Sequence, residues 1–115
     1  DAGLEFLDVT GRVHITLTDR SIHGGRRQDV YTITNNSDSP VDTHLLLVAT
    51  GLSFDDEMEN ASGRTTSGVP YLRVFLPNGV LLPGQSIVET LRFKQKPHAP
   101  PMTYTLILLS GQGNP

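Results

Sequence analysis

Alternation of apolar and polar residues is the feature of this sequence that most limits its fold. From Arg12 to Thr18 every second residue is apolar, and a similar alternation runs from Asp29 to Asn35. A period of two residues is typical of a β-strand with one buried and one exposed face. No long segment has helical periodicity, so the sequence predicts an all-β fold.

Turn signals separate the expected strands. Gly24-Gly25 and Pro77-Asn78-Gly79 each stand between apolar segments. In Leu82-Pro83-Gly84, proline presets the first bend and glycine supplies the positive φ of a type II turn. The segment 94–101 contains three prolines and is expected to be a loop. We expect about seven to eight antiparallel strands in a two-sheet sandwich over residues 1–110, with a frayed tail at 111–115.

The apolar faces of these strands define the expected core. Leu45 to Ala49 lacks alternation and fits a buried strand or a short helix, but β-branched Val48 and Thr50, with Gly51 following, favour a strand. The predicted core residues are Val13, Ile15, Leu17, Tyr31, Ile33, Leu45, Leu47, Val74, Leu91, Phe93, Leu106 and Leu108.

Length and composition exclude several classes of protein. A chain of 115 residues fits one domain. Nine Lys and Arg against 12 Asp and Glu argue against a dedicated nucleic-acid binder. The absence of cysteine excludes a thiol nucleophile, a disulfide framework and a zinc–thiolate site. The longest apolar run, Leu45 to Ala49, is too short to span a membrane.

Two groups of residues resemble immunoglobulin-like modules of bacterial extracellular proteins. Val-Tyr-Thr-Ile-Thr-Asn-Asn-Ser at 30–37 precedes a Leu-rich strand, and Leu-Pro-Gly-Gln-Ser at 82–86 precedes Leu-Arg-Phe at 91–93. The similarity extends over roughly residues 28 to 110. Such modules are similar to fibronectin type III and immunoglobulin domains. The resemblance implies an immunoglobulin-like β-sandwich, a bacterial source, a secreted or cell-surface location and no shared catalytic residue.

An acidic run is the most highly charged segment of the chain. It consists of Asp55, Asp56, Glu57, Glu59 and Asn60, with Met58 between the two glutamates. Carboxylate and amide oxygens are the ligands that calcium takes, so these five residues are candidate calcium ligands. The Asp-x-Asp-x-Asp-Gly spacing of a calcium loop is missing, however, and a solvated acidic loop is favoured. No other cofactor is expected.

Two functions from different classes follow from these features. The first is a non-catalytic spacer or protein-interaction module whose partners are the neighbouring domains of a larger protein. The second is a carbohydrate-binding module that anchors an adjoining catalytic domain to a polysaccharide through the 53–68 loop. Tyr71, with neighbouring Arg73, would then lie exposed and stack on a sugar ring.

Catalysis and a histidine metal site are not favoured. Histidines stand at 14, 23, 44 and 98, and no pair has short metal-ligand spacing, so surface or strand-end positions are expected. No Gly-x-Ser-x-Gly elbow marks a nucleophile, and the chain is not expected to be an enzyme.

Basic residues near the expected Gly24-Gly25 turn allow a further interaction surface. Arg26 and Arg27, with Arg12, Arg20 and His23, can form a basic patch for an acidic polysaccharide or a partner protein. A solvated hairpin turn is the favoured alternative.

Overall fold

The chain folds into antiparallel β-structure, as the alternation predicted. The described residues form eleven strands, more than the seven to eight expected because several are only two or three residues long, and two short 3₁₀ helices. The computed structural model describes residues 6–42 and 44–111. The strands are β1 (Phe6–Asp8), β2 (Val13–His23), β3 (Arg26–Asn35), β4 (Val41–Asp42), β5 (Leu45–Thr50), β6 (Asp56–Met58), β7 (Gly63–Arg64), β8 (Pro70–Val74), β9 (Val80–Leu81), β10 (Ser86–Gln95) and β11 (Thr105–Gly111), and the 3₁₀ helices are η1 (Thr10–Arg12) and η2 (Pro77–Gly79).

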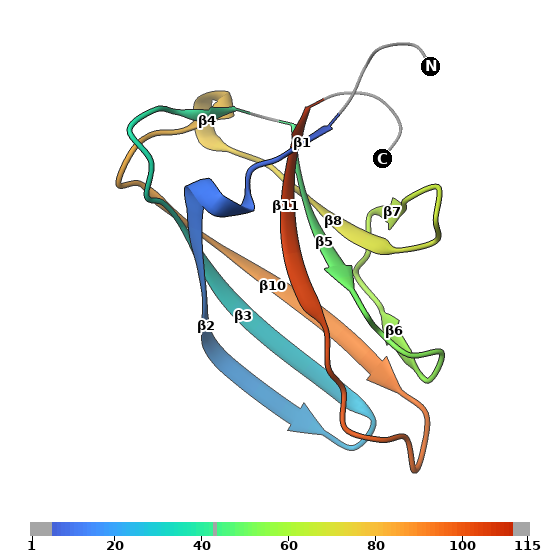
Figure 1. The fold of residues 1–115 in the computed structure, drawn as a ribbon. Coiled ribbons are helices and arrows are strands. Elements are labelled where there is room, and N and C mark those ends of the chain that lie inside the picture. Colours follow the sequence, from blue (N-terminus) through green and yellow to red (C-terminus); the bar gives the residue numbers. More distant parts are fainter. Residues whose placement is uncertain (1–5, 43, 112–115) are drawn as a thin grey trace.

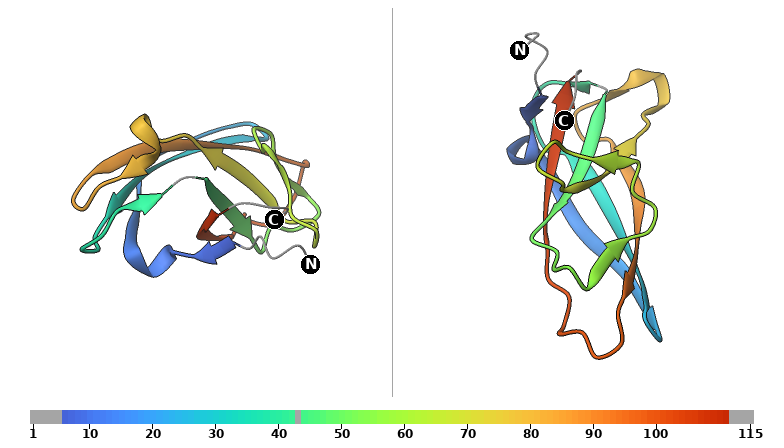
Figure 2. Two further views of the ribbon diagram at one scale, coloured as in Figure 1. Left: turned by 90° about the horizontal axis from the view of Figure 1, so that it is seen from above. Right: turned by 90° about the vertical axis from the view of Figure 1, so that its right-hand side faces the viewer.

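Two sheets make up the body of the molecule. One has the strand order β1-β11-β5-β8-β7 and the other β2-β3-β10-β6, while β4 and β9 form a small ribbon. Seen from above, they form layers (Figure 2). One apolar cluster joins Ile33, Leu91 and Phe93 of the second sheet to Leu47 and Leu108 of the first. Burial of each such side chain contributes about 1.5–3 kcal/mol, so the shared core holds the sheets together.

Most of the predicted core is buried. Ile33, Leu45, Leu47, Val74, Leu91, Phe93 and Leu108 are at most 1% exposed, and Val13, Ile15, Tyr31 and Leu106 are partly buried against them. Leu17 is the exception at 39% exposed, because it lies on the edge strand β2 where the other sheet does not cover it.

The run Leu45 to Thr50 is a strand, and both of its faces are covered. Leu45 and Leu47 face the shared core, whereas Leu46 and Val48 belong to a second cluster with Tyr71 on the other side of the sheet. A strand buried on both faces needs no alternation, which is why its periodicity was ambiguous.

A buried asparagine explains the Asn-Asn-Ser sequence after β3. Asn35 is fully buried, and its Nδ2 donates to the carbonyls of Ser39 (2.9 Å) and Leu81 (2.8 Å). Its Oδ1 accepts from the Ser37 backbone N–H at 2.9 Å. Asparagine is therefore needed for turn construction here, because one side chain bonds groups on both sides of the β4–β9 ribbon.

The two ends of the described chain lie side by side. Phe6 is the register partner of Gly111, whereas the turn between β2 and β3 and the loop after β10 lie at the opposite end (Figure 1). Gly111 belongs to β11, and the remainder of the expected tail, residues 112–115, lies outside the described residues.

Candidate functional site

Tyr71 is covered, so the expectation that its ring is exposed is wrong. It is 9% exposed and packs against Leu46 and Val48 on the outer face of its sheet. Strand β7 lies beside it, with Gly63 as its register partner, and a Cβ at Gly63 would stand 2.7 Å from the Tyr71 hydroxyl. Arg73 is partly exposed, and its backbone N–H donates to Ser62 Oγ. The ring face of Tyr71 is not open for stacking on a sugar in this conformation.

The acidic run makes contacts with several different strands. Asp56 accepts from Gln95 Nε2 at 2.8 Å, and Glu59 pairs with Arg26 at 3.3 Å. The Asn60 amide donates to the Thr90 carbonyl and accepts from the Arg92 N–H. Asp55 precedes β6 and Glu57 alternates with Asp56 along it. Over residues 6–42 and 44–111, no three or more His, Asp or Glu side chains are gathered in a metal-binding arrangement.

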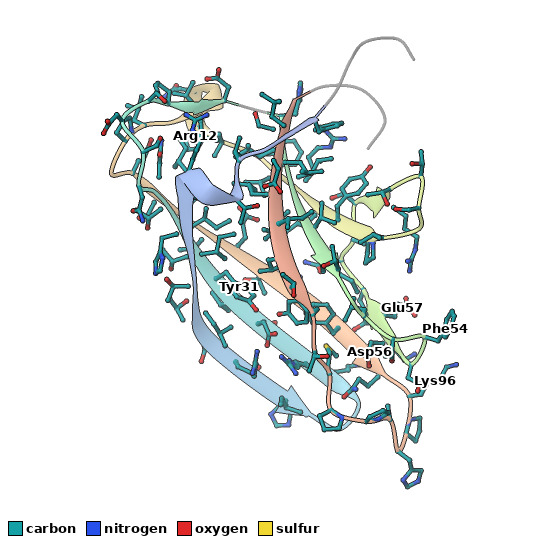
Figure 3. The ribbon with its side chains drawn as sticks, in the orientation of Figure 1. Arg12, Tyr31, Phe54, Asp56, Glu57 and Lys96 are labelled. Carbon is teal, nitrogen blue, oxygen red and sulfur yellow. The ribbon has the colours of Figure 1, made fainter. Side chains whose placement is uncertain are left out.

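The histidines and basic residues are also dispersed. All four histidines are exposed, in agreement with the surface positions expected for them. Arg12 lies far from the β2–β3 turn, beside the segment that precedes β4, where its guanidinium group donates to Ser39 and Pro40 (Figure 3). Arg20 and Arg27 turn inward, and Arg26 points to Glu59. These residues therefore do not form one basic patch, a possibility that the sequence favoured less than a solvated turn.

A cleft lies beside the loop between β5 and β6, which overlaps the segment 53–68. Its volume is about 630 Å³. Phe54 on its rim is fully exposed, and Figure 3 shows the ring projecting away from the sheets. Met58 contributes apolar surface, and the polar lining residues include Ser53, Asp56 and Arg64. The sequence predicted an exposed aromatic ring at Tyr71 beside this loop, whereas the exposed ring in the structure is that of Phe54.

A buried ionic network lies between the sheets at β3. The Asp29 carboxylate is fully buried. It accepts hydrogen bonds from Arg20 Nε at 2.8 Å and from Arg27 Nε at 3.1 Å. The Tyr104 hydroxyl also donates to Asp29 and lies 2.7 Å from the Tyr31 hydroxyl. No buried polar side-chain atom in the described part of the chain lacks a hydrogen-bond partner.

The network changes the protonation behaviour of its members. Burial acts to raise the pKa of Asp29, but hydrogen bonds from Arg20, Arg27 and Tyr104 outweigh it and lower that pKa below its usual value. Burial, followed by the bond to Asp29, raises the pKa of Tyr104 strongly. The hydrogen bond to Asp29 also raises the pKa of Arg20. Asp29 therefore stays ionised and Tyr104 stays neutral at pH 7.

A β-bulge brings Arg20 into this network. The register of β2 with β3 shifts between Leu17 and Asp19, so that Leu17 faces Tyr31 and Arg20 faces Asp29. Uninterrupted alternation would have placed Asp19 and not Arg20 on the inner face. The network is not evident from the sequence pattern, because the bulge reverses the alternation without a glycine or proline to mark it.

A second hollow lies between the edges of β2 and β11. This groove has a volume of about 410 Å³ and is lined by Thr10, Val13, Ile15, Tyr31, Tyr104, Thr105 and Leu106. The hydroxyl groups of its two tyrosines, Tyr31 and Tyr104, hydrogen-bond to each other at the ionic network. The groove is therefore apolar along β2 and polar at the Tyr104 end.

No protein-family model and no curated protein matches the sequence. Within the described ranges, no helix has the length and apolar character needed to cross a membrane.

Proposed function

We propose that the chain is an immunoglobulin-like, non-catalytic interaction module of a larger secreted or cell-surface bacterial protein. The resemblance of segments 30–37 and 82–86 to such modules supports the fold family and location. The pairing of Phe6 with Gly111 is the observation that favours interaction over spacing. A spacer holds its neighbours apart most effectively when the chain enters at one end and leaves at the other. Here the two points at which a flanking chain would attach, beside β1 and β11, lie at the same end of the molecule. The sandwich would therefore extend away from its neighbours and not stand between them.

Energy transfer between two fused reporter proteins tests this proposal. With a cyan fluorescent protein before the module and a yellow one after it, the interaction role predicts efficient transfer in the folded state. Unfolding in urea lengthens the connection and reduces the transfer, because an unfolded chain is much more expanded than a folded domain. Low transfer in the folded state would contradict the proposal and favour a spacer.

Carbohydrate binding is the second candidate, and the cleft beside the 53–68 loop supports it. An exposed ring next to hydroxyl, carboxylate and guanidinium groups combines an apolar stacking surface with hydrogen-bonding partners for sugar hydroxyls. Phe54 supplies the ring, and Ser53, Asp56 and Arg64 supply the polar groups. In this version of the hypothesis Phe54 takes the role first given to Tyr71.

Affinity electrophoresis against a panel of soluble polysaccharides tests the second candidate. Phe54→Ala should abolish retardation, while Phe75→Ala should leave it unchanged, since Phe75 is also exposed but follows β8 beside the start of β5. Repeating the run with calcium and with a chelator tests the acidic run as a calcium site. Loss of retardation only on chelation would indicate a metal-shaped surface, and no retardation by any polymer would reject the candidate.

A further inference from the structure

One stretch of β11 has an uncovered edge. Strand β1 pairs only with Leu109, Ser110 and Gly111. The pairing is extended by two bonds at Leu108, whose carbonyl accepts from the Val9 N–H and whose N–H donates to Thr10 Oγ1. In the part of the chain that the structure describes, no strand pairs with residues 105–107 on this side.

Backbone geometry gives this edge its hydrogen-bonding capacity. The N–H and C=O of Leu108 point toward β1. Backbone groups on an antiparallel strand point alternately to its two neighbours, so those of Leu106 point to the same, uncovered side. The residue directly opposite Leu106 on an added strand would exchange both backbone hydrogen bonds with it.

The other edges carry features that prevent strand pairing. Strand β2 has the bulge between Leu17 and Asp19 and a charged side chain at Arg20. The remaining edge strands are short: β1 and β6 have three residues each, and β4, β7 and β9 have two each. Thr105, Leu106 and Ile107 have no charge, proline or bulge. Because proteins normally protect their sheet edges, an unprotected edge beside a groove is suited to binding an extended chain.

The groove next to this edge matches one face of such a chain. The side chain of Leu106 faces the core, so the residue opposite it would point the same way, onto Val13 and Ile15 across the groove. The next inward-facing side chain of the added strand stands two positions from the residue opposite Leu106, about 7 Å away. It would lie level with Tyr104. The apolar row along β2 continues with the exposed Leu17 and Ile22.

Charge distinguishes the two ends of the groove. At the Tyr104 end, two guanidinium groups share the single carboxylate of Asp29. Arg27 is only 12% exposed, but the Arg20 side chain is 38% exposed and accessible to a second acceptor. An acidic side chain at this end would compensate the excess positive charge, whereas a basic one would be repelled.

We propose that the edge of β11 and its groove bind an extended peptide segment of a partner protein by β-strand addition. The segment carries an apolar residue opposite Leu106 and an acidic residue two positions away, toward Arg20. This inference rests on the proposed interaction function and specifies the chemistry of the partner.

Fluorescence anisotropy with labelled heptapeptides tests the inference. The first probe is Thr-Ser-Thr-Ile-Thr-Glu-Thr, with three comparison peptides that contain Lys for Glu, Ser for Ile, or an N-methylated Ile. We expect saturable binding of the first probe and at least roughly tenfold weaker binding of the Lys peptide. Loss of binding by the N-methylated peptide would show that backbone pairing is required.

Variants of the protein locate the binding site. Ile15→Trp fills the groove and should weaken binding at least roughly tenfold, since it removes the space for the apolar side chain. Thr16→Trp, exposed on the opposite face of β2, is the matched control and should bind normally. If Ile15→Trp does not fold, amide hydrogen exchange of the wild-type protein locates the site instead. Bound peptide should slow the exchange of the Leu106 amide.

Two results would overturn the inference. One is the absence of binding by every peptide at millimolar concentration. The other is self-association in sedimentation experiments with Leu106 protected only at high protein concentration, which would assign the edge to a second copy of the chain. Either result leaves the interaction function intact if energy transfer between fused reporters is efficient, so the two proposals fail separately.

Discussion

The Tyr104 hydroxyl donates a hydrogen bond to the buried carboxylate of Asp29, which lies 75 residues earlier in the chain. Tyr104 immediately precedes β11 of one sheet and Asp29 lies in β3 of the other. The Tyr104 ring also packs on Phe93, with the ring centroids 4.9 Å apart. A polar contact and an aromatic contact therefore connect the two sheets at the same place.

Replacement of Asp29 should destabilise the fold because Arg20 and Arg27 would lose the carboxylate that they share. Asp29→Asn removes the charge that compensates Arg20 and Arg27, and loss of one partner of a buried ion pair costs about 3 kcal/mol. Urea unfolding at pH 7 measures this loss. Asp38→Asn, at an exposed position, is the control and should change the free energy of unfolding by less than about 0.5 kcal/mol.

The effect of Asp29→Asn should depend on pH. The pKa of Asp29 is lowered in the folded state, so its contribution is complete above the unfolded pKa of about 3.9 and is lost as pH falls through the folded value. The stability difference between wild type and variant should therefore shrink as the pH is lowered below about 4. A difference that stays constant down to pH 2 would contradict the ionised network.

Tyr104 should make the fold sensitive to alkali. Its folded pKa is raised, so its contribution is complete below the unfolded pKa of about 10 and is lost as pH rises above that value. Tyr104→Phe should cost about 1 kcal/mol at pH 7 and less at higher pH. In absorbance titrations at 295 nm, the step on unfolding at pH 11 should be larger for wild type than for the variant by the signal of one tyrosine.

Asn35 should be indispensable for the turn that follows β3. Asn35→Ala leaves the Leu81 carbonyl without its side-chain donor and should cost about 2 kcal/mol. Asn36→Ala, at the exposed neighbouring position, should change stability by less than about 0.5 kcal/mol. Thermal unfolding of both variants checks the difference, and equal losses would refute the role given to the Asn35 amide.

Glu89 should be a position at which stability can be gained. It lies opposite Tyr31 on the inward row of β10, and burial raises the pKa of its carboxyl group. The folded state is therefore disfavoured as pH rises through that pKa. Glu89→Gln should raise the Tm by about 2 °C at pH 7 and change it little at pH 4. The exposed Glu57→Gln is the control in the same thermal scans.

Local pattern predicted the architecture well where one face of a strand is buried. Ile33, Leu91 and Phe93 were identified from alternation alone, and Gly84 has the positive φ of +81° that its turn requires. The errors arose where a neighbouring element decided exposure. Leu17 is exposed because the other sheet does not extend over that part of β2 among the described residues, and Tyr71 is buried because β7 lies beside it.

The sequence by itself determined the strands, their turns and most of the apolar core, because alternation and turn residues act between near neighbours in the chain. Tertiary structure alone decided which polar groups lie inside. Asp29 is buried since a bulge directs Arg20 toward it and the distant Tyr104 donates to it. The uncovered edge of β11 likewise results from how far β1 extends along it, which depends on the packing of the whole molecule.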